Sequence, residues 1–269
     1  ITKLTTGKTY VCKKYKSELP TLPKFENIEV HSFGGPHPSG LTGTHMHFLN
    51  PPSANKTMWS VGYQDAIAIG ELFKTGYLSK NRIVALAGPM AKNPRLLEVM
   101  NGSSLSEIVR GETTSDLNCR IISGSILTGR NGEGAYGYLG RYARQISMIE
   151  EDTTQIPFGW IRPQGNKYSV MPVLISAFQK SKLFEVTSNL NGGRRAMVPT
   201  GVFESLMPQD YLPTQLLRSL LVMDTDTAQN LGALELDEED VALCTFACPA
   251  KYEYGQALRE SLQKIEKEG

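Results

Sequence analysis

The 269 residues carry 28 basic and 27 acidic side chains, a net charge of +1, which argues against a nucleic acid or another polyelectrolyte as partner. The length is sufficient for two or three domains with buried cores. Four cysteines (Cys12, Cys119, Cys244 and Cys248) are too few and too scattered for a disulfide framework and favour a reducing compartment. No apolar run approaches the roughly 18–20 residues that span a bilayer, and no secretory signal is present.

The first region, residues 1–77, alternates short strands with helices, which predicts an α/β layer with parallel strands. We expect strands near 9–12 and 28–33 and a buried strand at 57–61. Helices are expected at 41–49, before Pro51 and Pro52, and at 63–76, where apolar residues recur at helical spacing. The chain starts at Ile1 in strand-like sequence, so we expect it to be a piece of a longer polypeptide.

All four histidines of the chain, His31, His37, His45 and His47, lie in this region. A zinc site needs three or four ligands, and no cysteine or acid lies close enough in sequence to complete one. His45 and His47 are two residues apart and should point to different sides of a helix. Helix packing and loop hydrogen bonds are therefore the favoured interpretation, with a metal site as the alternative.

A glycine-rich loop, residues 34–43, joins the predicted strand at 28–33 to the following helix. Such loops can bind phosphate at a helix N-terminus. However, the loop has no G-x-G-x-x-G pattern and no Walker lysine, and its two prolines remove amide donors. A conformational role alone would explain its glycines, and a nucleotide site is the alternative.

The second region, residues 78–158, is richer in strands, which we expect at 82–88, 95–99, 119–123 and 142–149. A short helix is predicted at 104–109, with Ser103 or Ser104 as its cap and Glu107 completing a capping box. Two strands, one helix and then further strands is the order typical of a small β-grasp domain. The glycines between 124 and 140 predict a long mobile loop.

The third region, residues 159–269, is punctuated by proline and glycine as far as Pro213 and is then mostly helical. Pro213 suits a first helical turn, and an apolar stripe follows it. The acids at 237–240 indicate another helix start, and a last helix is expected at 252–267. The turn at Gly192-Gly193-Arg194-Arg195 is interpreted as a solvated bend, with an anion or an acidic partner as the alternative. The stripe after Pro213 consists of Leu216, Leu217, Leu220 and Leu221.

Near the C-terminus lies half of an iron–sulfur motif. Ferredoxin clusters are held by the run C-x2-C-x2-C-x3-C-P, and here only Cys244, Cys248 and Pro249 remain of it. Counting back by threes, Val241 and Glu238 occupy the first two ligand positions. Because a four-iron cluster needs four ligands, we expect a helical frame that has lost its cluster. We assign no catalytic, cofactor-binding or metal-binding residue in this chain.

Several stretches together resemble the A subunits of the sodium-translocating NADH:quinone oxidoreductases. The most specific is the run from Cys244 to Gly255. The others are residues 35–38, 43–49, 121–125, 138–142 and 231–240. A more distant likeness links the chain to the C subunit of the Rnf complex and to the flavin-binding component of respiratory complex I.

The resemblance implies an α/β plus α+β fold in three parts. These are a partial Rossmann-like domain at 1–77, a β-grasp domain of the soluble-ligand-binding (SLBB) type at 78–158, and a linker followed by a helical domain at 159–269. The helical domain would resemble a ferredoxin module without a cluster. A barrel domain and the start of the α/β domain would lie in the missing N-terminal part.

The resemblance also implies a function, which is that of a peripheral subunit on the cytoplasmic face of a bacterial inner membrane. The complex would couple NADH oxidation and ubiquinone reduction to sodium export. NADH, FAD, FMN, a [2Fe–2S] centre and ubiquinone would be used in or with other subunits. The chief partners would be the B subunit, which is embedded in the membrane, together with the C subunit; ubiquinone is a candidate ligand. The alternatives are an independent soluble-ligand-binding protein, or a flavin- or iron–sulfur-containing NADH dehydrogenase.

Overall fold

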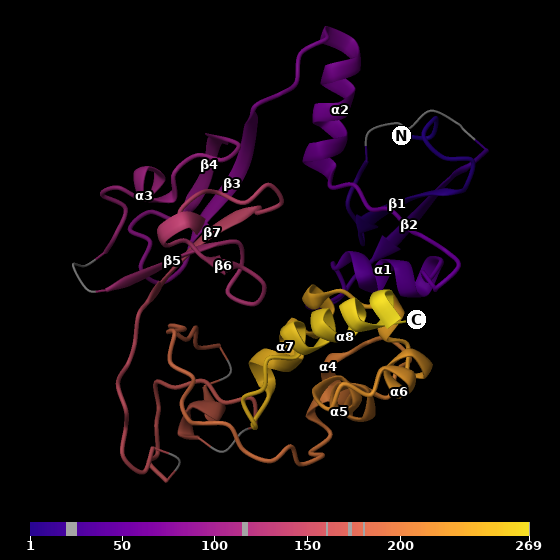
Figure 1. The fold of residues 1–269 in the computed structure, drawn as a ribbon. Coiled ribbons are helices and arrows are strands. Elements are labelled where there is room, and N and C mark those ends of the chain that lie inside the picture. The colour runs from indigo at the N-terminus through magenta and orange to yellow at the C-terminus, as the bar shows by residue number, and fades with distance from the viewer. Residues whose placement is uncertain (20–25, 115–117, 160, 172–173, 180, 269) are drawn as a thin grey trace. The chain divides into compact units, whose positions relative to one another are not determined.

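The computed structural model describes residues 1–19, 26–114, 118–159, 161–171, 174–179 and 181–268 (Figure 1). The fold is mixed α/β, with two sheets and several helices. The chain divides into two compact units. Unit 1 combines residues 1–78 with residues 194–269, and unit 2 is residues 79–193. The last segment of the chain thus packs with the first, and the middle segment forms a unit of its own.

The N-terminal part of unit 1 contains two strands and two helices. Strands β1 (Thr9–Lys14) and β2 (Ile28–Phe33) pair in parallel, and helices α1 (Thr42–Leu49) and α2 (Tyr63–Thr75) follow. These elements confirm the parallel pairing, but both strands come first and both helices follow, so the predicted alternation of strands with helices is wrong. The buried strand predicted at 57–61 is wrong, because these residues form no strand and Trp59 is 87% exposed. An apolar run becomes a strand only where a neighbouring strand pairs with it.

The C-terminal part of unit 1 is helical. It contains α4 (Val202–Leu206), α5 (Pro213–Leu221), α6 (Thr225–Asn230), a 3₁₀ turn (Ala233–Glu235), α7 (Glu238–Ala247) and α8 (Tyr254–Glu268). Pro213 opens α5, as predicted, and Asp237 caps α7 with its side chain. The stripe after Pro213 supplies the core: Leu216, Leu217 and Leu220 are fully buried together with Phe203 and Leu258.

Unit 2 is built on a five-stranded sheet. Its strands are β3 (Asn81–Ala87), β4 (Arg95–Met100), β5 (Cys119–Ser123), β6 (Arg130–Asn131) and β7 (Gln145–Glu150), in the order β4-β3-β7-β5-β6. The β3–β7 pair is parallel and the other pairs are antiparallel. Helix α3 (Leu105–Ile108) contributes Leu105 to the core beneath the sheet, beside Val84 and Met148.

Two details of unit 2 differ from the sequence prediction or refine it. The capping box predicted for α3 is wrong: Ser104 takes the N-cap position, but its hydroxyl pairs with Ser106 and caps no backbone amide. The loop at 124–140 holds strand β6 and a 3₁₀ turn (Gly134–Tyr136). Gly124 has φ +114°, and a side chain there would lie 2.8 Å from the Cα of Gly129. The mobility of this loop stays a prediction.

Residues 151–193 of unit 2 contain a single 3₁₀ turn, Ile175–Phe178, among the residues that the structure describes. Thr187 forms an isolated bridge with Glu150, and the other described residues of this segment are turns, bends and irregular chain. Across the described part of the chain, every helix is too short or too polar to cross a membrane.

Candidate functional site

Helix α1 carries two of the four histidines and contacts the C-terminal helices of the same unit. His47 lies on this junction. Its Nδ1 is 3.0 Å from Oε2 of Glu235 and 3.1 Å from the hydroxyl of Tyr211, and the backbone N–H of Asp210 donates to its Nε2 over 3.3 Å. The Tyr211 hydroxyl donates to the same Glu235 oxygen over 2.9 Å. Burial, followed by the Glu235 carboxylate, raises the pKa of Tyr211 far above its usual range, so this hydroxyl stays a hydrogen-bond donor.

One turn earlier on α1, Gly43 lies directly against a buried carboxyl group. A Cβ at this position would be 2.1 Å from Oδ2 and 2.3 Å from Oδ1 of Asp240. Oδ2 accepts the N–H of Asp237 over 3.0 Å and so completes the capping box of α7. Asp240 is 5% exposed, and burial raises its pKa. The two helices therefore approach so closely that α1 needs a glycine at this point.

Thr44 and Gln209 add a third polar contact to this junction. The Thr44 hydroxyl, almost fully buried, donates to the carbonyl of Pro38 over 3.2 Å, and Nε2 of Gln209 donates to the same hydroxyl over 3.3 Å. The junction is therefore a largely buried set of polar contacts, which we name the α1 seam: Gly43, Thr44, His47, Gln209, Tyr211, Glu235 and Asp240. It joins residues about 165–190 positions apart in the chain.

The α1 seam bears on the phosphate-binding alternative for the glycine-rich loop. The first turn of α1 is the positive end of its helix dipole, and an anion would bind there. The Asp240 carboxyl group already lies there against Gly43, so an anionic ligand would meet a resident acid. The loop itself is closed by its own contacts, with Ser39 donating to the carbonyl of Gly35, which has φ +133°. These contacts favour the conformational role of the glycines.

The four histidines do not converge. Nε2 of His45 is 3.0 Å from the carbonyl of Ser39, and its ring lies 4.0 Å from that of Phe33; burial lowers its pKa. His31 is paired with Glu29, and His37 is exposed. Among the described residues, no three His, Cys, Asp or Glu side chains are grouped to hold a metal. His45 and His47 point to different partners, which confirms the interpretation of helix packing and loop hydrogen bonds for these two.

The iron–sulfur remnant occupies α7 and its C-terminal end. Val241, Cys244 and Cys248 are buried in the hydrophobic core of unit 1, and the Cys248 sulfur lies 3.2 Å from the Tyr254 hydroxyl. Glu238 instead forms a two-point ion pair with Arg259 at the surface. Burial raises the pKa of the Cys244 thiol to about 12, whereas cluster ligation requires thiolates. Two buried thiols among packed side chains do not fit a cluster.

The Gly192–Arg195 turn spans the point in the chain where unit 2 ends and the second segment of unit 1 begins. The backbone N–H of Arg195 donates to the carbonyl of Ala250 over 3.2 Å. The role of this turn as a bend or as an anion site stays a prediction.

Sequence reasoning missed Gln209, Tyr211 and Glu235 as members of the α1 seam. Their partners Thr44 and His47 are more than 160 positions away in the chain. No spacing signal could have found them, because the contacts arise only when α1 packs on the C-terminal helices.

Comparison with known proteins shows which proteins this polypeptide resembles. Residues 1–78 match the family model of the NqrA second alpha/beta domain, and residues 83–134 match that of the NQRA C-terminal domain. The chain is 54% identical over 269 residues to the A subunit of the Na(+)-translocating NADH-quinone reductase of Neisseria meningitidis serogroup A / serotype 4A. That alignment covers 100% of this chain and 60% of the relative. The chain belongs to the NqrA family.

Further relatives of the same name match this chain to a similar degree. The relative from Hahella chejuensis is 53% identical over 267 residues, covering 99% of this chain and 59% of its own length. The relative from Pasteurella multocida is 52% identical over 269 residues, covering 100% of this chain and 60% of its own length. The chain thus spans about three fifths of the length of the relatives that it matches.

Proposed function

We propose that this chain forms part of the A subunit of a sodium-translocating NADH:quinone reductase, with a structural and assembly role in that complex. The observation that carries the proposal is identity above 50% over the whole chain to relatives that bear this name. The alternatives of an independent ligand-binding protein and a flavin- or cluster-containing dehydrogenase gain no support from the α1 seam or from α7.

Within this proposal, the chain supplies no redox centre and no catalytic, cofactor-binding or metal-binding residue. NADH, the flavins, the [2Fe–2S] centre and ubiquinone are used in or with other subunits, and the B and C subunits are the chief partners. The complex lies in the bacterial inner membrane, with this chain on its cytoplasmic face. The packed state of Cys244 and Cys248 supports the part of the proposal that concerns clusters.

The proposal extends to the domains. Residues 1–77 form a partial Rossmann-like domain, residues 78–158 a β-grasp domain of the SLBB type, and residues 159–269 a linker and a ferredoxin-like helical domain without a cluster. Support comes from the parallel β1–β2 pair followed by helices, from the mixed sheet with one helix against it, and from the half-motif on α7.

Deleting the A subunit from a bacterium and restoring it as the full-length protein tests the function. Sodium-dependent NADH:quinone reductase activity in membranes should disappear on deletion and return on complementation. Purified chain without partners should be colourless and should not oxidise NADH. Titration of the chain with a soluble ubiquinone analogue, followed by NMR, tests direct quinone contact. Unchanged activity after deletion would contradict the proposal.

A further inference from the structure

Residues 155–186 of unit 2 form a long loop that is fastened at its base. The chain leaves strand β7 and returns to it, with a bridge between Glu150 and Thr187 and a hydrogen bond from the N–H of Ser188 to the carbonyl of Glu150 over 3.0 Å. Nδ2 of Asn189 donates to the carbonyl of Thr154 over 2.6 Å and to Asp152 over 3.2 Å. The two ends of the loop are therefore held together.

The interior of this loop is ordered by polar contacts and has almost no core. The Ser176 hydroxyl donates to the carbonyl of Lys167 over 2.6 Å, and Nε2 of Gln164 donates to the carbonyl of Gly159 over 2.6 Å. The rings of Tyr168 and Phe184 lie 5.8 Å apart. Neither hydrophobic core cluster of the molecule includes a described residue of the loop.

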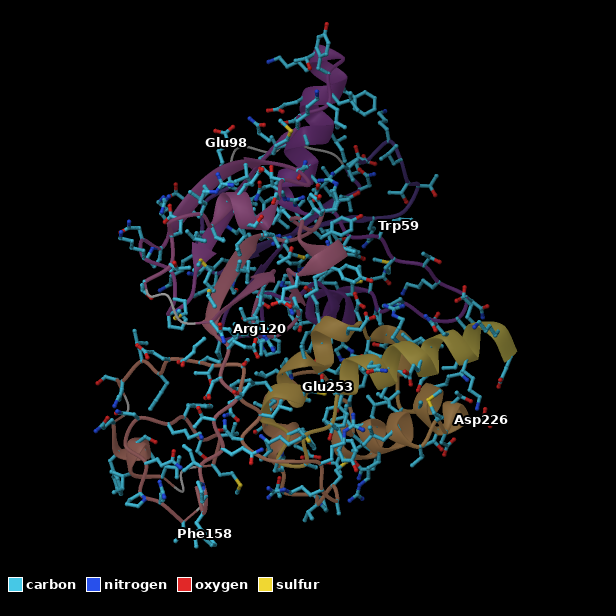
Figure 2. All side chains as sticks on the ribbon, turned by 60° about the vertical axis from the view of Figure 1, so that its left-hand side comes forward. Trp59, Glu98, Arg120, Phe158, Asp226 and Glu253 are labelled. Atoms are coloured by element: carbon cyan, nitrogen blue, oxygen red, sulfur yellow. The ribbon has the colours of Figure 1, made fainter. Side chains whose placement is uncertain are left out.

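The loop nevertheless exposes many large apolar side chains. Leu183 is 94% exposed, Phe178 89%, Phe158 70% and Ile161 62%. Figure 2 shows the labelled Phe158 at the outer edge of the loop. Scattered single exposures are ordinary on a protein surface, but this concentration in one loop marks an interaction site. Among the described residues, the loop also exposes Ile156, Tyr168, Val170, Met171 and Ile175.

The net charge of the loop also differs from that of the rest of the chain. Residues 155–186 contain the basic residues Arg162, Lys167, Lys180 and Lys182 and the single acid Glu185, a net charge of +3. The whole chain has +1, so the remaining residues sum to −2. A surface that receives this loop must therefore offer apolar area together with negative charge.

An anionic protein surface fits these features better than a lipid surface. Segments that lie on membranes are usually amphipathic helices with one continuous apolar face. Here prolines and glycines interrupt the first half of the loop, and its described part contains one 3₁₀ turn and no α-helix that could present a continuous apolar face. Aromatic residues, methionine and arginine are enriched at protein–protein interfaces, and the loop exposes side chains of each kind.

We propose that the described residues of the loop, 155–159, 161–171, 174–179 and 181–186, form a docking surface of this chain and bind an acidic, apolar surface of another subunit of its complex. This inference rests on the proposed function, because it requires that the chain works within a complex. Its partner is a protein with carboxylates around an apolar patch, and the exposed aromatic and leucine side chains are the anchors.

The test uses the full-length protein in its complex, purified through a tag on another subunit. Phe178→Ser with Leu183→Ser should lower the amount of this protein that co-purifies by about tenfold, as loss of two anchors implies. Both side chains are so exposed that the fold should not change. Leu96→Ser with Val222→Ser is the matched control, because these residues are 72% and 74% exposed outside the loop, and it should co-purify normally.

Charge reversal gives an independent variant. Arg162→Glu should weaken co-purification and make the association less sensitive to salt, because it removes an attraction to the acidic partner. Arg110→Glu reverses an exposed charge elsewhere in unit 2 and should have no such effect. Normal co-purification of both loop variants would overturn the proposal.

Two further outcomes separate this inference from its alternatives. Flotation of the purified chain with phosphatidylglycerol vesicles should show no binding; binding that the loop variants abolish would assign the loop to lipid and overturn the protein partner. If removal of the whole protein leaves quinone reduction intact, the proposed function fails. If removal abolishes it while the loop variants assemble normally, only the docking proposal fails.

Discussion

Replacing Gly43 by alanine is the sharpest test of the α1 seam. An added Cβ would lie 2.1–2.5 Å from three atoms of the Asp240 carboxyl group, more than 1 Å inside normal contact. The carboxyl group cannot easily turn away, because it is 5% exposed and one oxygen holds the first turn of α7. Helix α1 must therefore move away from α7, or the capping box must break.

The magnitude follows from two opposing effects. Forcing an extra carbon into a packed contact typically destabilises a protein by about 1–3 kcal/mol. Alanine favours a helix over glycine by about 0.8–1 kcal/mol, which offsets part of that loss. We expect a net destabilisation of about 1–2 kcal/mol, which for domains of this size lowers the melting temperature by about 2–4 °C per kcal/mol.

Gly70→Ala is the matched control. Gly70 lies inside helix α2, and nothing lies within 4 Å of a Cβ built there. This variant gains the helix propensity without the contact, so it should be stabilised by about 0.8–1 kcal/mol. Urea unfolding of both variants, followed by circular dichroism, separates the two effects. Adding Asp240→Ser to Gly43→Ala should restore part of the loss.

The reasoning would be refuted by a Gly43→Ala protein that is stabilised as much as Gly70→Ala. That result would mean that α1 and α7 do not approach as closely as the structure has them. An equal loss with and without Asp240→Ser would place the conflict elsewhere than at the carboxyl group.

Three further predictions concern the same unit. Cys244→Ala with Cys248→Ala should leave NADH:quinone activity of the complex largely intact and destabilise the chain by about 1–3 kcal/mol; loss of iron or of activity would contradict the packed interpretation of these thiols. Burial raises the pKa of Asp240 above its usual 3.8. Between these two pKa values the folded state therefore binds a proton that the unfolded state has lost. The stability of the folded state consequently falls as pH rises from the unfolded pKa through the raised pKa. Urea midpoints of Asp240→Asn, measured from pH 4 to pH 7, should therefore rise relative to those of the unmodified chain; a constant difference would show that Asp240 does not titrate in this window. Tyr211→Phe removes a donor to the Glu235 carboxylate and should cost about 1–3 kcal/mol in thermal or urea unfolding, whereas an unchanged stability would mean that water replaces the hydroxyl.

Local patterns were enough to predict most elements. Local apolar patterns located β2, α2 and β3 to within one residue, and Pro213 and the acids at 237–240 marked two helix starts. Hydrophobic spacing and capping chemistry act over a few residues, so both can be recognised in the sequence alone. The strand expected at 57–61 failed because strand formation depends on a neighbouring strand that no local pattern reveals.

In the candidate site, too, local sequence patterns predicted some features and tertiary packing decided the others. The lost cluster ligands could be counted from Glu238, Val241, Cys244 and Cys248, because ligand spacing along one helix is a local property. The burial of Val241 in the core and the ion pair between Glu238 and Arg259 could not be predicted in this way, because both depend on what packs against α7.

By itself, the sequence determined most of the helices and strands, the loss of two of the four cluster ligands, and the family. Only the tertiary structure decided which surfaces meet. His47 contacts Glu235 and Gly43 contacts Asp240, although each pair is nearly 200 residues apart in the chain. The loop at 155–186 exposes apolar side chains that belong to neither hydrophobic core. The physical reason is that burial and close approach are properties of three-dimensional neighbours, whereas turn chemistry and periodicity are properties of adjacent residues.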